Sequence, residues 1–131
     1  MFPDQAVSHE QHVAFARGFG EVIHLPQLHS VDGHPDVQVI RRLATETMER
    51  MGDVHILVNN AGAAWGSPAE DHPVEAWDKV MNLNIRGYFI LSQHVAKASM
   101  IPRKTGRIIN IASIAGLGGN PPGMQTIAYN T

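Results

Sequence analysis

The chain has 131 residues, of which 44% are hydrophobic; this suffices for one hydrophobic core and gives no reason to expect two domains. Its 10 Lys and Arg residues against 12 Asp and Glu residues give a net charge of -2, which excludes the strongly basic surface typical of nucleic-acid-binding proteins. It contains no cysteine, which excludes disulfide bonds, thiolate metal sites and cysteine nucleophiles.

The N-terminal segment and the histidines give no sign of export, membrane insertion or metal binding. Residues 1–10 include acidic and histidine side chains in place of a basic stretch followed by an apolar one, and no apolar run approaches the length of a transmembrane helix. His9 and His12 have the spacing of one helix face, but no third ligand completes a recognisable metal set. We therefore predict a cytoplasmic protein with no metal, no nucleic-acid partner and no membrane partner.

Local patterns predict a helix and then a strand near the start of the chain. Residues 8–18 carry an apolar cluster among polar neighbours and are followed by glycines, which are typical helix stop signals. Residues 21–25 have the composition of a short strand. Pro26 ends it, because proline cannot donate a hydrogen bond to a neighbouring strand.

A longer helix and a buried strand are predicted next. Between residues 36 and 51 apolar side chains recur every three or four positions, as on one face of an amphipathic helix, with Asp32 or Asp36 as the candidate cap. Residues 54–58 form a nearly continuous aliphatic run. Such a run is typical of a parallel strand covered by helices on both faces.

The second half of the chain repeats this alternation. We expect helices at residues 74–81 and 85–100, with Phe89, Ile90 and Val95 on the inner side of the longer helix. The order of strands and helices predicts an α/β fold.

A turn, a strand and a loop are expected to follow. Pro102 and residues 105–106 predict the turn, and residues 107–112 a second buried strand. Glycines and prolines are frequent in residues 113–126, which are therefore predicted to be a loop at the carboxyl end of that strand. Ligands of open α/β sheets bind at this edge.

Four residues directly after the first buried strand form a candidate binding motif: Asn59, Asn60, Ala61 and Gly62. A glycine at a strand end lets the backbone approach a ligand closely, and paired amides can bridge neighbouring loops. A simple turn would explain the glycine but not two asparagines before it.

Asn84, Ser113 and Tyr129 stand at the ends of further predicted elements. Each has an ordinary interpretation, since asparagine and serine often cap helices and a tyrosine is often an interfacial aromatic. Together, a serine hydroxyl can hold a substrate oxygen while a phenol gives or takes a proton.

In this order and at these element ends, the residues resemble the central part of a short-chain dehydrogenase/reductase, from about residue 36 to residue 131. The resemblance implies an α/β fold, namely an incomplete Rossmann-like doubly wound parallel sheet in which strands one and two and the C-terminal strands are missing. It implies one partial domain over residues 1–131, with 36–131 as the central dehydrogenase segment and 1–35 of doubtful homology. The 16-residue step from Ser113 to Tyr129 resembles the gluconate/polyol dehydrogenase and 3-oxoacyl reductase branch.

The resemblance also implies an activity, the NAD(P)-dependent interconversion of a secondary alcohol and a ketone. Ser113 would orient the oxygen of this small-molecule substrate, Tyr129 would transfer the proton, and Asn84 would hold a water that relays protons. The residues that would contact NAD or NADP are Asn59, Ala61, Gly62 and Tyr129. The complete protein is expected to be a homo-oligomer.

Two parts of the family's site do not occur in these 131 residues. A phenol has an ordinary pKa of about 10, so that it needs a nearby cation to act as a base near neutrality. In the family a lysine four residues after the tyrosine supplies this charge, and here that position lies beyond Thr131. A glycine-rich turn that opens a helix and binds pyrophosphate is also absent, because Gly18 and Gly20 precede a strand. We therefore expect a fragment, a truncated gene model or a degraded gene whose product is inactive by itself.

The resemblance also bears on the pairing of the strands. Without strands one and two, the strand at residues 54–58 would expose one edge. We expect the strand at residues 21–25 either to pair directly with it or to lie two strand widths away.

Two other functions are compatible with the sequence. A non-catalytic interaction module could use the helix at residues 85–100, which packs between subunits in oligomers of the family. A serine hydrolase would use Ser113, but residues 111–115 lack the glycines of a nucleophile elbow.

Overall fold

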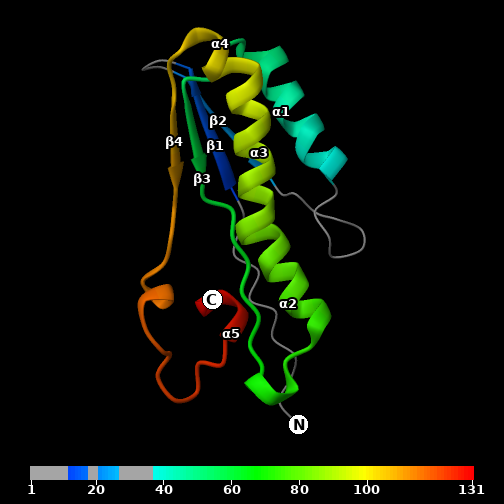
Figure 1. Cartoon of the computed structure of the whole chain (residues 1–131), viewed down its shortest axis with the longest axis vertical. Helices are drawn as coiled ribbons and strands as arrows, with labels where there is room; N and C mark the ends of the chain where they lie inside the picture. The colour runs from blue at the N-terminus through cyan, green and yellow to red at the C-terminus, as the bar shows by residue number, and fades with distance from the viewer. Residues whose placement is uncertain (1–11, 18–20, 27–36) are drawn as a thin grey trace.

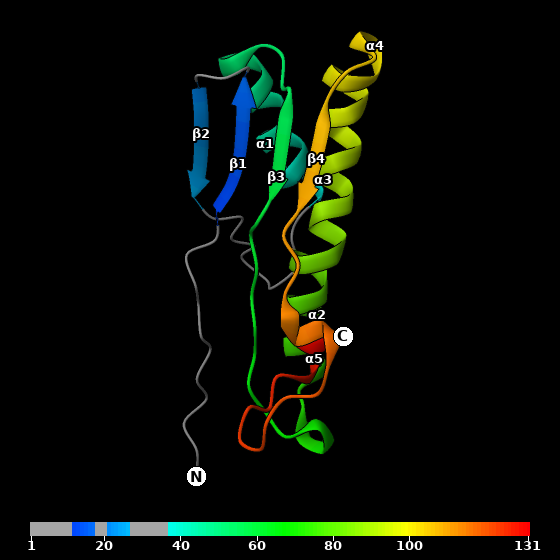
Figure 2. The same ribbon diagram turned by 90° about the vertical axis from the view of Figure 1, so that its left-hand side faces the viewer.

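The computed structural model describes residues 12–17, 21–26 and 37–131, and these form a four-stranded sheet with helices on one side. The strands are β1 (His12–Arg17), β2 (Glu21–Pro26), β3 (Ile56–Asn59) and β4 (Arg107–Asn110), in the spatial order β2-β1-β3-β4. β3 and β4 are parallel, whereas β1 is antiparallel to both of its neighbours. Figure 2 shows the four strands side by side, with the helices behind them.

The helix predicted for residues 8–18 is wrong over the part that the structure describes, because residues 12–17 form β1. β1 pairs with the edge of β3 that was expected to be exposed, with Phe15 opposite Leu57. The strand predicted at residues 21–25 is confirmed as β2, but it neither pairs with β3 nor leaves a gap, since β1 lies between them. Pairing on this edge satisfies backbone groups of β3 that a helix would have left without partners.

The helix predicted for residues 36–51 is confirmed as α1 (Val37–Met51). Its buried residues recur at helical spacing and are Ile40, Ala44, Thr47 and Met51. Gly52 has a φ of 69° and donates its N–H to the carbonyl of Met48, the usual left-handed ending of a helix. The predicted caps, Asp32 and Asp36, lie outside the described residues.

A continuous helical segment connects β3 to β4, where two separate helices were predicted (Figure 1). It consists of α2 (Val74–Met81), the π-helical turn η2 (Asn82–Gly87), α3 (Tyr88–Val95), a second π-helical turn η3 (Ala96–Met100) and α4 (Ile101–Arg103). Pro102 lies near the start of α4, within this continuous segment, and the chain turns only at Lys104, which has a φ of 54°.

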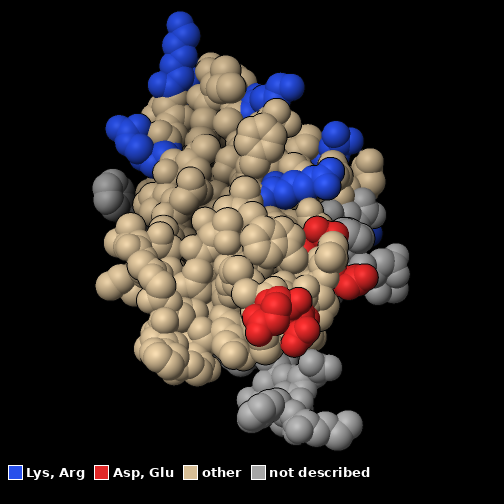
Figure 3. Space-filling view, turned by 60° about the horizontal axis from the view of Figure 1, so that its bottom comes forward, with Lys and Arg blue, Asp and Glu red and all other residues tan. Residues whose placement is uncertain are grey.

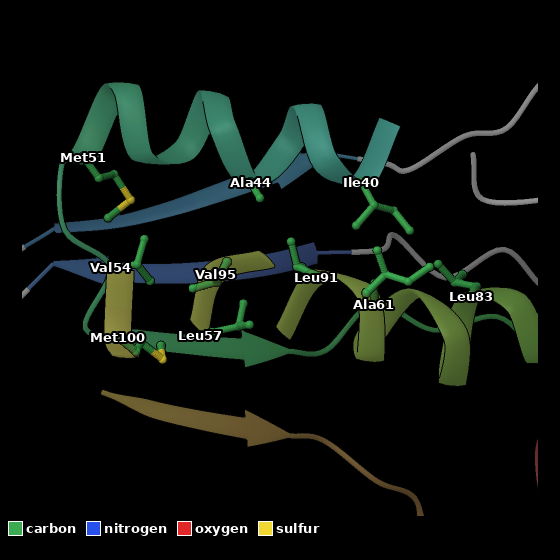
Figure 4. Close-up of a cluster of buried hydrophobic side chains, with 11 residues drawn as sticks. Ile40, Ala44, Met51, Val54, Leu57, Ala61, Leu83, Leu91, Val95 and Met100 are labelled. Carbon is green, nitrogen blue, oxygen red and sulfur yellow. The ribbon is translucent and has the colours of Figure 1, made fainter. Parts of the chain in front are cut away.

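The core lies between the sheet and the two helices α1 and α3, which contact each other on the same face of the sheet. Figure 4 shows the inward side chains of this cluster, among them Leu57 of β3 and Val95 of α3, both 0% exposed. Ile90 and Val95 face inward as predicted, but Phe89 does not, because it is 66% exposed.

β4 is not the buried strand that its composition predicts. All four of its residues are exposed, although Ile108 is the register partner of the fully buried Leu57. The difference arises because β4 is at the edge of the sheet among the described residues and the helices cover only one face of that sheet (Figure 2). Among the described residues, no helix combines the length and apolar character needed to cross a bilayer.

Candidate active site

Asn59 ends β3 with its side chain entirely inside the fold. Its Nδ2 donates to Ser92 Oγ on α3 at 2.9 Å and to Asn110 Oδ1 at the end of β4 at 2.8 Å. Asn110 is also its register partner in the sheet. The Oδ1 atom of Asn59 is buried and has no hydrogen-bond partner among the residues that the structure describes, and Asn59 is 0% exposed. The side chain of Asn59 thus links the ends of β3 and β4 to α3.

Asn84 binds the loop that follows β3 instead of capping a helix. Its Oδ1 accepts the N–H of Ala63 and its Nδ2 donates to the carbonyl of Ala63, both at 2.9 Å. Asn84 lies within the π-helical turn η2, a conformation that is rare and frequent at functional sites. One amide therefore satisfies both backbone groups of one loop residue, as a neighbouring strand would.

Tyr88 makes a second contact between this helix and the loop after β3. Its hydroxyl donates to the carbonyl of Ala61 at 2.5 Å. Tyr88 was not among the residues selected from the sequence. It could have been found from its position four residues after Asn84, which places both side chains on the same side of a helix.

Gly62 leaves space open at the end of β3. Its φ is not positive, and a Cβ built on it would find no atom nearer than Asn84 Oδ1 at 3.8 Å. Neither the backbone conformation nor packing within the described residues therefore requires glycine here. The missing side chain leaves room for the close approach of a ligand.

Tyr129 lies on the short helix α5 (Ile127–Asn130) and is 37% exposed. Burial, followed by charge repulsion from Tyr129, raises the pKa of Tyr88 to about 12.

This pKa predicts a loss of stability at high pH. Because the Tyr88 phenol ionises at an ordinary value of 10.0 in the unfolded chain and at about 12 in the fold, its contribution is fully present below pH 10 and is lost as the pH rises to about 12. After allowance for screening by water at a half-buried group, we expect a loss of about 1 kcal/mol. Urea unfolding across this range should show it in the wild type and in Tyr129→Phe but not in Tyr88→Phe. The same decline in Tyr88→Phe would contradict the assignment.

Ser113 follows β4 and caps the 3-10 helix η4 (Ile114–Leu117). Its Oγ accepts the N–H of Ala115 at 3.2 Å, and the residue is half-buried. The carbonyl of Ala115 accepts a hydrogen bond from Asn130 Nδ2 at 2.7 Å, and Asn130 is the neighbour of Tyr129. Ser113 and Tyr129 are thus connected through Ala115 and Asn130, neither of which was selected from the sequence.

The loops after β3 and β4 also meet directly. The N–H of Ser67 donates to the carbonyl of Gln125 at 2.7 Å, and Ser67 forms an isolated bridge with Thr126, the residue before α5. α5 in addition contacts α2 and η4. These contacts bring the segment that carries Tyr129 to the carboxyl edge of the sheet.

The structure brings together most of the residues selected from the sequence. Asn84 and Gly62 lie at the loop after β3, and Ser67 of the same loop bonds to the residues just before α5, which carries Tyr129. Ser113 is linked to the neighbour of Tyr129, Asn130, through Ala115. Asn59 and Ala61 differ from these in burial, at 0% and 3% exposed, so that their side chains point into the fold.

Charge is unevenly distributed on the face that carries the carboxyl edge. In Figure 3, Asp and Glu side chains gather in one patch, and Glu70, Asp71 and Glu75 are exposed around η1 (Ala69–Asp71) and the start of α2. Uncharged side chains cover most of the rest of this face. Within the described ranges, no three His, Asp or Glu side chains lie together in a way that could hold a metal ion.

Comparison with known proteins identifies the relatives of the chain. The family model described as short chain dehydrogenase matches residues 27–131. The chain is 40% identical over 92 residues to the rhamnolipids biosynthesis 3-oxoacyl-[acyl-carrier-protein] reductase of Pseudomonas aeruginosa, covering 68% of this chain and 35% of that protein. It is 44% identical over 77 residues to the 2-dehydro-3-deoxy-D-gluconate 5-dehydrogenase of Bacillus subtilis, covering 59% of this chain and 30% of that protein.

A solved structure is also similar to this chain in fold and sequence. The structure of NAD+-bound xylitol dehydrogenase superposes with a TM-score of 0.64 at 29% identity, covering 72% of this chain and 35% of that chain. The chain spans about a third of the length of the relatives that it matches. On the match of the family model and the shared order of motifs, the chain belongs to the short-chain dehydrogenase family.

Proposed function

We propose that this chain carries the nicotinamide-proximal part of an NAD(P)-dependent oxidoreductase site, which interconverts a secondary alcohol and a ketone in the complete protein. Ser113 orients the substrate oxygen, Tyr129 gives or takes the proton, and Asn84 holds the loop on which the cofactor lies. A nicotinamide bound there supplies or accepts the hydride. The complete protein is a cytoplasmic homo-oligomer.

One observation carries this proposal. Hydrogen bonds of Ala115 to Ser113 and Asn130, together with the bond from Ser67 to Gln125, connect the segment that carries Tyr129 to the loops after both parallel strands. General acid–base catalysis requires the proton-transferring group within reach of the group that holds the substrate. The absence of a side chain at Gly62 suits the close approach of a nicotinamide.

We expect the isolated 131-residue chain to be inactive, since no cation lies four residues after Tyr129 within it. Mixing the chain with NADH or NADPH and a panel of ketones, with nicotinamide absorbance as the measurement, should therefore show no turnover above background. Turnover comparable to that of a complete enzyme would overturn the expectation that a lysine and a glycine-rich turn are needed.

Weak binding of the cofactor by its nicotinamide end tests the site itself. In saturation-transfer NMR with NADH and, separately, NADPH, we expect stronger transfer to the nicotinamide protons than to the adenine protons. Gly62→Leu should reduce this transfer several-fold, because the side chain fills the open space at the end of β3. Gly119→Leu is the matched control, since a Cβ at Gly119 has no atom within 4 Å. Equal transfer to both rings, or equal effects of the two variants, would sink the proposed site.

A second candidate function, a non-catalytic interaction module, is favoured by the free edge of the sheet. Among the described residues β4 pairs with β3 alone. Large apolar side chains remain exposed on it and beyond it: Ile108 (40%), Ile109 (46%), Ile111 (49%), Ile114 (85%) and Leu117 (87%). An edge of this kind pairs readily with another chain.

This candidate predicts that a charge on β4 reduces association. Ile109→Lys should lower the mean mass in light scattering and weaken co-elution with a full-length relative, because a lysine opposes edge pairing. Val74→Lys is the control, since Val74 is 69% exposed but lies on α2. If both variants behave like the wild type, β4 is not an interaction surface.

A further inference from the structure

Tyr129 lies near the start of α5, so that few bonds of the helix itself hold it. The N–H groups of Tyr129 and Asn130 donate to the carbonyl of Thr126 at 3.0 and 3.1 Å. The first N–H groups of a helix have no partners in preceding turns and depend on neighbouring groups. Contacts with other segments therefore contribute to the position of the phenol.

Asn130 makes most of these contacts. Its Nδ2 donates to the Ala115 carbonyl at 2.7 Å and to Asn120 Oδ1 at 3.0 Å. Its Oδ1 accepts from Asn120 Nδ2 at 2.8 Å and from Thr126 Oγ1 at 2.9 Å. Both donors and both acceptor positions of the amide are thus used, three of them within residues 120–130 and one on the segment after β4.

The bond to Ala115 reaches the other proposed catalytic side chain. Ala115 accepts from Asn130 through its carbonyl, and its N–H donates to Ser113 Oγ. One peptide residue therefore lies between the amide of Asn130 and the hydroxyl of Ser113. The loop between them is rich in glycine, and a Cβ at Gly116, Gly118 or Gly119 would meet nothing within 4 Å, so that packing within the described residues constrains it little.

We propose that Asn130 is a positioning residue that holds the Tyr129 phenol in place relative to the Ser113 hydroxyl, by bonding the Ala115 carbonyl with Asn120 and Thr126 as its support. This inference rests on the proposed function, in which Ser113 and Tyr129 act on the same substrate oxygen. Asn130 itself touches neither of the two side chains through its amide. It acts by fixing the position of the Tyr129 phenol relative to the Ser113 hydroxyl.

The two tyrosines of the chain allow a direct test. With tyrosine labelled by 13C in the ring and serine labelled at Cβ, NMR reports Tyr129, Tyr88 and Ser113 in the same sample without cofactor. In Asn130→Ala we expect the Tyr129 ring signals to move toward those of a solvent-exposed tyrosine and the Ser113 signal to shift. The Tyr88 ring, which donates to Ala61, should keep its wild-type signals and reports that the fold is intact.

Two further variants separate positioning from a local effect on the neighbouring residue. Asn120→Ala lies nine residues before Tyr129 and removes only the support of Asn130, so that a smaller shift of both Tyr129 and Ser113 is expected. Asn130→Asp keeps the acceptor oxygen but loses the donor to Ala115, and it should move the Ser113 signal as Asn130→Ala does. If Asn130→Ala unfolds the chain, the Tyr88 signals change as well. Asn120→Ala and Asn130→Asp then provide the test, with shifted Tyr129 and Ser113 signals and unchanged Tyr88 signals as the expected result.

Wild-type Tyr129 and Ser113 signals in folded variants would overturn the inference. This outcome is distinct from failure of the proposed function, which appears as equal saturation transfer to the nicotinamide and adenine protons in the wild-type chain. Asn130 can therefore be shown to position Tyr129 even if no cofactor binds, and cofactor binding can be found even if Asn130 has no such role.

Discussion

Replacement of Asn59 by aspartate is expected to lower the free energy of unfolding by about 3 kcal/mol at neutral pH, because it places a carboxylate where no water can reach it. Asn59 is 0% exposed, and its Nδ2 is the donor in the bonds to Ser92 and Asn110. A carboxylate of the same shape offers oxygen in place of that donor. Only the hydroxyl of Ser92 and the amide of Asn110 could reorient toward it.

The pH dependence of this variant gives a second measurement. Burial raises the pKa of the introduced carboxyl above its ordinary value, so that it is protonated in the fold at a pH where it is ionised in the unfolded chain. The penalty should therefore shrink as the pH falls through the unfolded value, as measured by urea unfolding at several pH values.

Asn60→Asp is the matched control for this experiment. Asn60 is the next residue in the chain and is exposed, so the same substitution should change the free energy of unfolding by less than about 0.5 kcal/mol. Equal losses in the two variants would mean that Asn59 does not hold the strand ends to α3.

Gly106→Ala is expected to destabilise the fold by about 2 to 4 kcal/mol, since both its backbone and its surroundings require glycine. Gly106 has a φ of 152°, and a Cβ there would lie 2.4 Å from Met100 Cγ and 2.9 Å from Met100 Cβ. The far end of Met100 can move, but its Cβ is held by the helical backbone, and Met100 is only 7% exposed. The residue also begins the turn into β4, so relief of the clash would displace that strand.

Gly118→Ala tests whether the loss at Gly106 arises from this geometry. Gly118 has a φ of -169°, an extended conformation that any residue adopts, and a Cβ there would meet nothing within 4 Å. Alanine should therefore leave the stability unchanged or raise it slightly by restricting the unfolded chain. Chemical denaturation of both variants measures the difference, and a neutral Gly106→Ala would contradict the described packing of Met100.

The sequence predicted elements well where the signal was local. The apolar spacing of α1 and the glycine that ends it were sufficient to find that helix, and the aliphatic run before Asn59 was sufficient to find β3. These patterns depend on side chains within one turn or one strand, and no distant segment altered them.

The errors have a common physical origin in contacts between distant segments. Residues 12–17 form β1 because the edge of β3 offers backbone partners, which outweighs the helical appearance of the local pattern. The isoleucines of β4 predicted a buried strand, but burial depends on the elements that cover a strand. Among the described residues β4 is an edge strand, and the helices lie on one face of the sheet. Phe89 is likewise hydrophobic but lies on the exposed side of α3, and its hydrophobicity alone could not indicate that side.

The residues of the candidate site, too, could be predicted from the sequence only in part. The identity and order of Asn84, Ser113 and Tyr129 could be read from the chain, because each follows the end of a predicted element. The binding of both backbone groups of Ala63 by Asn84 depends on the π-helical turn η2, which has no simple sequence signal. The roles of Tyr88 and Asn130 were visible only once the loops after β3 and β4 were brought together.

The sequence by itself therefore determined the class of fold, the family and the residues at the strand ends, because turn chemistry and periodicity act between near neighbours. Only the tertiary structure decided which face of the sheet is covered, which strand occupies the edge of β3 and how Tyr129 is positioned. These depend on hydrogen bonds and burial between segments many residues apart, such as Asn59 with Asn110 and Asn130 with Ala115. Such pairings are decided by the free energy of the whole fold and leave little trace in any short stretch of the chain.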